Sequence, residues 1–232
     1  MNVVITGASK GIGKAIANKF AAAGARLFLC ARNNGPLTET VNELKALYPN
    51  ASFQCFTADL SVQQQAEDFA SFCLSQGIPD VVVNNAGSYV PGNIIDEAPG
   101  TLESMLAVNL LSAYHLTRKL LPSMIQNKHG HIINMCSIAG LKAYPGGGSY
   151  SISKFALNGF NQNLRQELMP LGIKVTGVFP GAVLTDSWGD YDNTAKRIME
   201  PSDIATMVYA ATQLSAQAVV EDIVIRPLLG DL

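Results

Sequence analysis

The sequence predicts a doubly wound α/β fold, a mostly seven-stranded parallel sheet with helices on both faces. Short apolar or β-branched runs alternate with helix-like segments along all 232 residues, a pattern typical of β-α-β crossovers. Several of the short runs, such as Val81-Val82-Val83 and Ile132-Ile133, are almost continuously hydrophobic, as in strands buried on both faces. Hydrophobic residues make up 48% of the chain, which favours a large core, and we expect residues 1–232 to form one domain.

Strands and helices are expected in regular alternation. The seven strands are predicted at the aliphatic and β-branched runs 2–6, 26–31, 52–57, 80–84, 131–136, 174–179 and 222–226. The six helices are predicted at segments with a periodic apolar face, 11–23, 36–48, 61–75, 101–126, 149–168 and 201–214. Pro36 and Pro201 suit the first turns of their helices, where a missing N–H group costs little. The segment 181–200 shows no periodicity, and a loop of this length is typical of a substrate-side lid.

Composition and charge exclude several classes of protein. The 16 basic and 18 acidic residues leave a formal charge of −2, without the basic excess of a nucleic-acid-binding protein. No apolar run approaches the ~20 residues needed to cross a membrane. The chain begins directly with a strand-like run, so we expect no signal peptide and a cytoplasmic location. The four cysteines and three histidines lack metal-ligand spacing, so no metal site is predicted.

Glycines at the first strand-to-helix turn predict a dinucleotide site. The first strand runs into Thr6-Gly7-Ala8-Ser9-Lys10-Gly11-Ile12-Gly13 and then into a helix. Glycines at this spacing allow a tight turn and a close approach to a pyrophosphate, while the N–H groups of the helix N-terminus attract phosphate. The alternative is a turn that needs glycine for its backbone alone. The residues expected to contact the cofactor here are Gly7, Ser9, Lys10, Gly11, Ile12 and Gly13.

The end of the second strand favours a phosphorylated ribose. NAD sites usually carry an acidic residue there, which accepts hydrogen bonds from the ribose hydroxyls. This chain has Arg32 instead, with Lys10 on the facing turn. Two cations suit a 2′-phosphate, since each charge-assisted hydrogen bond contributes roughly 1.5–3 kcal/mol. We therefore expect NADP(H) to be preferred over NAD(H); the alternative is that both cations are ordinary surface charges.

A serine, a tyrosine and a lysine are spaced for acid–base catalysis. Tyr150 and Lys154 are neighbours on one helical face, and Ser137 and Asn84 end strands whose carboxyl ends border the ligand site. The run Gly146-Gly147-Gly148 is expected to let the chain return toward the strand end. An ammonium group ~4–5 Å from the phenol would lower the phenol pKa by roughly 2–3 units, into the range useful for proton transfer. The alternative for Tyr-x-x-x-Lys alone is a surface helix that carries these residues by chance.

Together these motifs resemble the short-chain dehydrogenase/reductase (SDR) family, in its compact single-domain branch with a Rossmann-type fold. The resemblance covers nearly the whole chain and is specific, because it rests on many separate segments. These are the turn Thr6 to Gly13, Asp59-Leu60, Asn84-Asn85-Ala86-Gly87, Asn109, Ser137, Tyr150, Lys154 and Pro180-Gly181-Ala182-Val183-Leu184-Thr185.

The resemblance implies roles for individual residues. It implies that Asp59 contacts the adenine amine and that Lys154 also binds the nicotinamide ribose. Asn109 is implied to hold a water that links Lys154 to a proton relay, although a mid-helix asparagine by itself is more typical of a solvated position. Val183 and Thr185 are implied to contact the nicotinamide amide. Further expected cofactor contacts are Leu60, Asn85, Ala86, Gly87, Tyr150, Pro180 and Gly181.

The expected function is that of an NADPH-dependent carbonyl reductase working reversibly as an alcohol dehydrogenase. Tyr150 is expected to act as the acid and Ser137 to stabilise the alkoxide. Asn109 and Lys154 complete the catalytic set. Candidate substrates by resemblance are β-ketoacyl thioesters, small ketones, hydroxy acid derivatives and pteridine-like carbonyls. One alternative is a regulatory protein that senses NADP(H) without turnover, which would not need the complete Ser-Tyr-Lys set. A sugar-nucleotide epimerase or dehydratase would need a substrate domain for which 232 residues leave little space.

Two departures from the family pattern bear on assembly and on the substrate. The chain ends in Pro227-Leu228-Leu229-Gly230-Asp231-Leu232, without the Gly-Gly turn that helps many relatives form a tetramer. We therefore expect a homodimer, formed through the helices that start near Ser149 and Thr101, with a homotetramer as the alternative. The segment after Thr185 is short and has Trp188 and Tyr191 as its only aromatic residues, which predicts a small lid.

Overall fold

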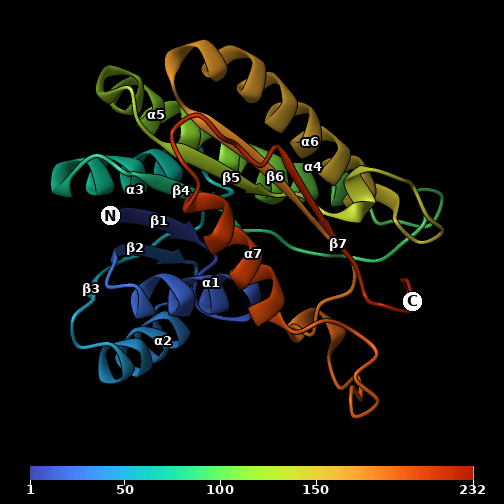
Figure 1. Ribbon diagram of the computed structural model, residues 1–232. Helices are drawn as coiled ribbons and strands as arrows, with labels where there is room; N and C mark the ends of the chain where they lie inside the picture. Colours follow the sequence, from blue (N-terminus) through green and yellow to red (C-terminus); the bar gives the residue numbers. More distant parts are fainter. Residues whose placement is uncertain (232) are drawn as a thin grey trace.

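One parallel sheet of seven strands organises the chain, and the computed structural model describes residues 1–231 (Figure 1). The strand order is β3-β2-β1-β4-β5-β6-β7, so the order reverses beside β1. This is the doubly wound, Rossmann-type arrangement that the sequence predicts. The strands are β1 (Asn2–Thr6), β2 (Arg26–Ala31), β3 (Ser52–Thr57), β4 (Val81–Asn84), β5 (His131–Met135), β6 (Lys174–Pro180) and β7 (Asp222–Ile225).

Helices cover both faces of the sheet (Figure 1). One face carries α1 (Gly11–Ala22), α2 (Asn34–Leu47) and α7 (Pro201–Thr212), and the other carries α3 (Gln63–Gln76), α5 (Ser112–Asn127) and α6 (Gly148–Leu168). A short helix, α4 (Thr101–Leu106), precedes α5. Each layer has its own hydrophobic core, and the large buried side chains of the two cores include Phe20 on the first side and Phe69 on the second.

The burial of each strand follows its place in the sheet. Every residue of β4 and β5 is buried, and so is all of β1 except Asn2. These central strands contact helices on both faces, which explains their continuous hydrophobic runs. The edge strands β3 and β7 instead mix buried with exposed residues. The predicted burial pattern is therefore confirmed for the centre of the sheet.

The ends of the helices lie within two residues of their predicted limits, and one predicted helix is interrupted. The predicted helix 101–126 is interrupted by a π-helical turn, Ala107–Leu111, between α4 and α5. A π turn adds a residue to one turn of helix, and this one contains Asn109, whose side chain is 1% exposed and bonds to groups outside the helix. Helix α2 begins at Asn34, two residues before the predicted start, so Pro36 is its third residue and still lies in the first turn.

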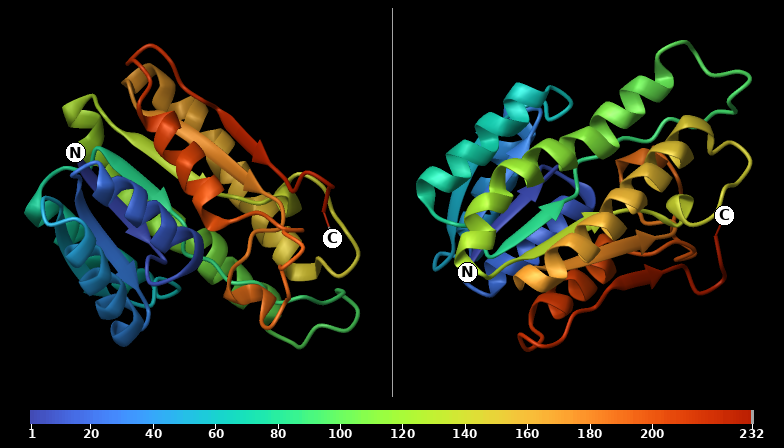
Figure 2. Two further views of the ribbon diagram at one scale, coloured as in Figure 1. Left: turned by 60° about the horizontal axis from the view of Figure 1, so that its bottom comes forward. Right: turned by 90° about the horizontal axis from the view of Figure 1, so that it is seen from above.

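Three long connections gather at the carboxyl ends of the strands. They are the segments 85–100, 136–147 and 181–200, which lie at the same end of the molecule in both views of Figure 2. Ligands of open parallel sheets bind at this end. The segment 181–200 is partly ordered by an isolated bridge between Val183 and Met199 and by a short helical turn, Asp186–Trp188. No helix among residues 1–231 has the length and apolarity needed to span a bilayer.

Candidate active site

The turn between β1 and α1 is shaped for a phosphate group. Gly7 and Gly11 have φ values of +63° and +54°, which favour glycine. A Cβ at Gly13 would lie 2.2 Å from the Gly7 carbonyl oxygen, so a side chain there would displace the turn. Lys10, the N-cap of α1, makes no side-chain capping hydrogen bond to the free N–H groups of the first helical turn. Because the backbone can approach a ligand closely and offers N–H donors, this turn fits a dinucleotide pyrophosphate.

The end of β4 is fastened to this turn. Thr6 Oγ1 accepts hydrogen bonds from the N–H groups of Asn85, at 2.9 Å, and Ala86, at 2.8 Å. Asn85 Nδ2 donates in turn to the Thr6 carbonyl at 2.9 Å and to the Gly7 carbonyl at 3.2 Å. The expected cofactor residues Asn85 and Ala86 thus lie directly beside the glycine-rich turn, and Gly87 follows them.

The two cations expected to read a ribose phosphate have different surroundings. Arg32 is exposed at the end of β2. The pKa of the Asp59 carboxyl is lowered first by a hydrogen bond from Ser61 and also by the positive charge of Arg32. Lys10 forms an ion pair with Asp186 of the 181–200 segment at 2.6 Å. Both groups of that pair are exposed, so the pair itself adds little stability.

The remaining expected cofactor contacts lie around the same turn. Thr185 approaches the turn closely, since a Cβ at Gly11 would lie 3.3 Å from Thr185 Cγ2. Val183 is buried and paired with Met199, while Pro180 ends β6 and Gly181 donates its N–H to the Ile225 carbonyl. The other three have mixed exposure: Leu60 is buried in the core, and Ser9 and Ile12 are partly exposed.

The structure brings Ser137, Tyr150 and Lys154 together. Ser137 follows β5, and its side chain shares a hydrogen bond with Tyr150 in the first turn of α6. Lys154 Nζ lies 5.8 Å from the centre of the Tyr150 ring and donates to the Met135 carbonyl at 2.9 Å. The side chain of Lys154 is buried, with 6% of the residue exposed. The predicted grouping is therefore present in the structure.

The pKa of Tyr150 departs in the opposite direction from the one predicted. Burial raises it above 10, and the hydrogen bond with Ser137 only partly opposes that rise. Lys154 is not among the main causes of this shift, and its buried ammonium donates to the Met135 carbonyl. Burial lowers the pKa of Lys154 from 10.5 to about 8. At neutral pH the tyrosine is therefore protonated and the lysine is charged.

Asn109 holds the start of the 85–100 segment. Its side-chain oxygen accepts from Ser88 N–H at 2.8 Å, and its Nδ2 donates to the Ser88 carbonyl at 3.1 Å. The same Nδ2 lies 2.9 Å from Ser153 Oγ, which donates to the Tyr150 carbonyl at 2.7 Å. Asn109 is thus connected to the helix that carries Tyr150 and Lys154. It is not the solvated residue that its mid-helix position by itself would suggest.

Asn84 does not reach the site, contrary to the prediction. It is buried, and its Nδ2 donates to Thr117 Oγ1 and to Asn134 Oδ1, both at 2.9 Å. Asn134 Nδ2 continues the row by donating to Asn161 Oδ1 at 2.9 Å. Successive strand residues point to opposite faces, so Asn84 faces α5 and α6 while Asn85 faces the glycine-rich turn.

Two residues that the sequence motifs did not single out, Tyr89 and Glu97, contact Tyr150 and the residue before it. The Tyr89 ring meets the Tyr150 ring edge-on, with centroids 4.8 Å apart. Burial raises the pKa of Tyr144, and Tyr89 adds to that rise. The Glu97 carboxylate accepts hydrogen bonds from Ser149, directly before Tyr150. Tyr89 follows the Asn-Asn-Ala-Gly motif by two residues, a spacing that could have predicted its place at the site. Among the described residues, no cluster of three or more His, Cys, Asp or Glu side chains could hold a metal ion.

Comparison with known proteins finds relatives along nearly the whole chain. The family model for short chain dehydrogenases matches residues 1–196. An uncharacterised oxidoreductase of Staphylococcus epidermidis is 34% identical over 227 residues, which are 97% of this chain and 96% of the relative.

Solved structures show the same similarity in three dimensions. A metagenomic short-chain oxidoreductase in complex with NADP is 34% identical, with a TM-score of 0.85 over 98% of this chain and 96% of that one. An alcohol dehydrogenase from the archaeon Thermococcus sibiricus, complexed with 5-hydroxy-NADP, is 28% identical, with a TM-score of 0.91 and the same 98% and 96% coverage. Both similarities therefore include the sheet and nearly all of the segments that form the site.

Proposed function

The chain belongs to the short-chain dehydrogenase family, and from this premise we propose that it is an NADP(H)-dependent carbonyl reductase that also oxidises the corresponding alcohol. One observation carries the proposal: Ser137, Tyr150 and Lys154 converge at the carboxyl end of β5, next to a turn that fits a dinucleotide. The similar structures named with NADP and 5-hydroxy-NADP support this cofactor class.

The residues that would hold the cofactor surround the glycine-rich turn. The N–H groups at the start of α1 would bind the pyrophosphate, and Arg32 with Lys10 would bind the 2′-phosphate. Lys154 would bind the nicotinamide ribose, with Val183 and Thr185 near the ring amide. When bound, the nicotinamide supplies a hydride for carbonyl reduction or accepts one for alcohol oxidation.

The side chains of this site supply the proton chemistry. Ser137 holds the carbonyl oxygen by a hydrogen bond, and Tyr150 gives its phenolic proton to that oxygen as the carbon receives hydride. The carbonyl compound is thereby reduced to an alcohol, and the phenolate regains a proton from solvent. Burial keeps Tyr150 protonated at neutral pH, which is the form that reduction requires. Asn109 and Ser153 hold the first turn of α6, and the Lys154 ammonium lies 5.8 Å from the centre of the Tyr150 ring.

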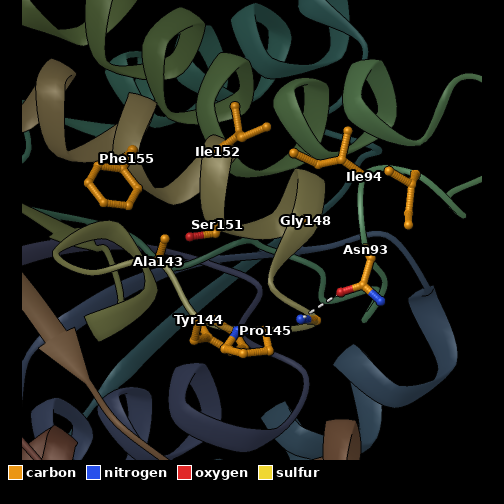
Figure 3. Close-up of a pocket in the computed structure, with 11 residues that line it drawn as sticks. Asn93, Ile94, Ala143, Tyr144, Pro145, Gly148, Ser151, Ile152 and Phe155 are labelled. Carbon is orange, nitrogen blue, oxygen red and sulfur yellow. Dashed lines mark hydrogen bonds between the residues drawn. The ribbon is translucent and has the colours of Figure 1, made fainter.

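We also propose that the protein acts in the cytoplasm as a homodimer, each chain forming one domain with the segment 181–200 as its lid. Leu111, Ile152 and Phe155 expose apolar side chains around α5 and α6. Ile94, Ile152 and Phe155 line a groove of about 460 Å³, and Figure 3 shows Ile152 between the other two. A second copy would cover these side chains by a two-fold contact. Sedimentation velocity tests this proposal, and a monomer at micromolar concentration would contradict it.

The test of function is NADPH consumption with β-ketoacyl thioesters, small ketones and diketones, for the wild type and Tyr150→Phe. We expect turnover of at least one class by the wild type, with a loss of roughly 10²–10⁴-fold in the variant. Far-UV circular dichroism and NADPH affinity should be unchanged. Tight NADPH binding without turnover of any compound would refute the reductase and favour a sensor of NADP(H).

A further inference from the structure

The 85–100 segment is joined to the start of α6 by four hydrogen bonds. Gly92 N–H donates to the Gly146 carbonyl at 3.0 Å, and Gly146 N–H donates to Asn93 Oδ1 at 3.1 Å, the bond drawn in Figure 3. The Glu97 carboxylate accepts the other two bonds, from Ser149 N–H at 2.8 Å and from the Ser149 hydroxyl. The next residue after Ser149 is Tyr150, so two of these bonds end one residue before the proposed acid.

The glycine run before α6 is shaped around this carboxylate. Gly148 has a φ value of +37°, and a Cβ there would lie 2.1 Å from Glu97 Oε1 and 2.5 Å from the Gly92 carbonyl oxygen. Any side chain at this position would therefore displace Glu97. Gly148, expected with its two neighbours to do no more than reverse the chain, leaves room for a specific contact between two loops that are far apart in the sequence.

The same carboxylate supplies a cap that α6 lacks. The N-cap residue Gly147 has no side chain, and the first turn of α6 contains no acidic residue. A helix N-terminus carries unpaired N–H groups and a partial positive charge, which a carboxylate neutralises. Glu97 provides both the acceptor and the negative charge from outside the helix, at 2.8 Å from Ser149 N–H.

The joined segment also touches the tyrosine directly. Asn109 holds Ser88 at one end of the segment, and Glu97 holds Ser149 at the other. Between these two anchors, the Tyr89 ring lies edge-on against the Tyr150 ring. A segment fixed at both ends can hold the phenol in one orientation, whereas loss of the Glu97 carboxylate would remove both bonds to Ser149, the residue directly before Tyr150.

We propose that Glu97 is a positioning residue of the reductase, whose carboxylate fixes the first turn of α6 so that the Tyr150 hydroxyl meets the substrate carbonyl. The inference rests on the proposed function and adds to it a residue outside the Ser-Tyr-Lys set. Glu97 transfers no proton. It acts on Tyr150 through Ser149, while the glycine-rich turn and Lys154 are held by other contacts. Loss of the carboxylate should therefore lower kcat and leave cofactor affinity unchanged.

The test compares Glu97→Ala with Glu97→Gln and Ser149→Ala, and uses Glu103→Ala as the matched control. Glu103 is exposed on α4 and makes no side-chain hydrogen bond or ion pair within residues 1–231. We expect Glu97→Ala to lower kcat by roughly tenfold or more, because a small misplacement of a reacting group is costly. Glutamine can accept from Ser149 N–H and donate to the Ser149 hydroxyl, so Glu97→Gln should stay within about threefold of the wild type.

The pattern of effects separates positioning from general stability. NADPH affinity should stay within about twofold in every variant, and the double variant Glu97→Ala/Ser149→Ala should lose no more kcat than Glu97→Ala, since both changes break one contact. An unchanged kcat in Glu97→Ala, or a loss of kcat that only follows a loss of NADPH affinity, would overturn the proposal.

A second readout does not depend on turnover. Hydrogen–deuterium exchange of residues 146–152 should be faster in Glu97→Ala than in Glu103→Ala, in the protein without cofactor. If the wild type turns over no carbonyl compound, the proposed function fails, and this exchange then decides the positioning role by itself. Equal exchange in the two variants would overturn that role even where the reductase is confirmed.

Discussion

Replacement of Lys154 by methionine should abolish turnover and yet make the folded protein more stable at neutral pH. Lys154 is a buried ammonium whose described partner is the Met135 carbonyl, at 2.9 Å. Burial lowers its pKa from 10.5 to about 8. Each pKa unit corresponds to about 1.36 kcal/mol, so the buried charge destabilises the fold by about 3 kcal/mol below pH 8. Methionine fills a similar volume and carries no charge.

The expected gain is smaller than this cost, because the hydrogen bond to Met135 is lost as well. Leaving that carbonyl without its partner costs about 1 kcal/mol, so the net stabilisation is about 2 kcal/mol. For a chain of this size each kcal/mol raises Tm by about 2–4 °C, which predicts an increase of about 4–8 °C. NADPH-dependent turnover should be abolished, because the ammonium that would bind the nicotinamide ribose is lost.

The pH dependence gives the sharpest check, by thermal denaturation of both proteins without cofactor. Between pH 8 and 10.5 the unfolded chain holds a proton on Lys154 that the folded chain has lost. The stability of the wild type relative to the variant therefore rises with pH in this window, and the advantage of methionine shrinks. Lys142→Met, at an exposed lysine, should show no such trend. A Tm below that of the wild type at pH 7, or an advantage independent of pH, would refute the reasoning.

Three further substitutions test the cofactor site. Gly13→Ala places a Cβ 2.2 Å from the Gly7 carbonyl oxygen, so it should destabilise the fold by about 1–3 kcal/mol and weaken NADPH binding. An unchanged Tm and an unchanged Kd for NADPH would contradict this close approach. Arg32→Ala should raise the Kd for NADPH roughly tenfold or more and leave that for NADH unchanged, and fluorescence titration that finds an unchanged ratio would exclude a role in reading the 2′-phosphate. Asp186→Asn should free Lys10 from its 2.6 Å ion pair and tighten NADPH binding severalfold at low salt, with no effect on NADH binding. Equal changes in the Kd values of both cofactors would show that Lys10 does not contact the 2′-phosphate.

The fold was predictable because each signal is local. A buried parallel strand reads as an aliphatic run and a helix as a periodic face, so the seven strands and the major helices lie within a few residues of their predicted limits. The convergence of Ser137 with Tyr150 was also predictable, since the carboxyl ends of parallel strands meet at one edge. The π turn at Asn109 was not predictable, since the partner of the Asn109 side chain, Ser88, lies in a different segment.

The parts that the sequence did not predict all depend on contacts between distant segments. The direction of the Tyr150 pKa follows from burial at the site, where Tyr89 packs against the ring. The contact of Glu97 with Ser149 joins two loops with no shared motif. Asn84 was placed at the ligand edge because it ends a strand, and the alternation of side chains along that strand would have placed it on the opposite face.

The buried amides behind the site also determine how the strands align. Residues of β1, β4 and β5 are similar aliphatic runs, which could slide past one another with little loss of hydrophobic contact. In the observed pairing Asn84 stands opposite Asn134, and their side chains are hydrogen-bonded in the interior. A shift of β5 by one residue would leave these amides without their hydrogen-bond partners. The free-energy cost is about 1–3 kcal/mol for each unpaired group. The hydrogen-bonded asparagines therefore favour one alignment of β5 with β4. This alignment determines where the end of β5 places Ser137 relative to α6.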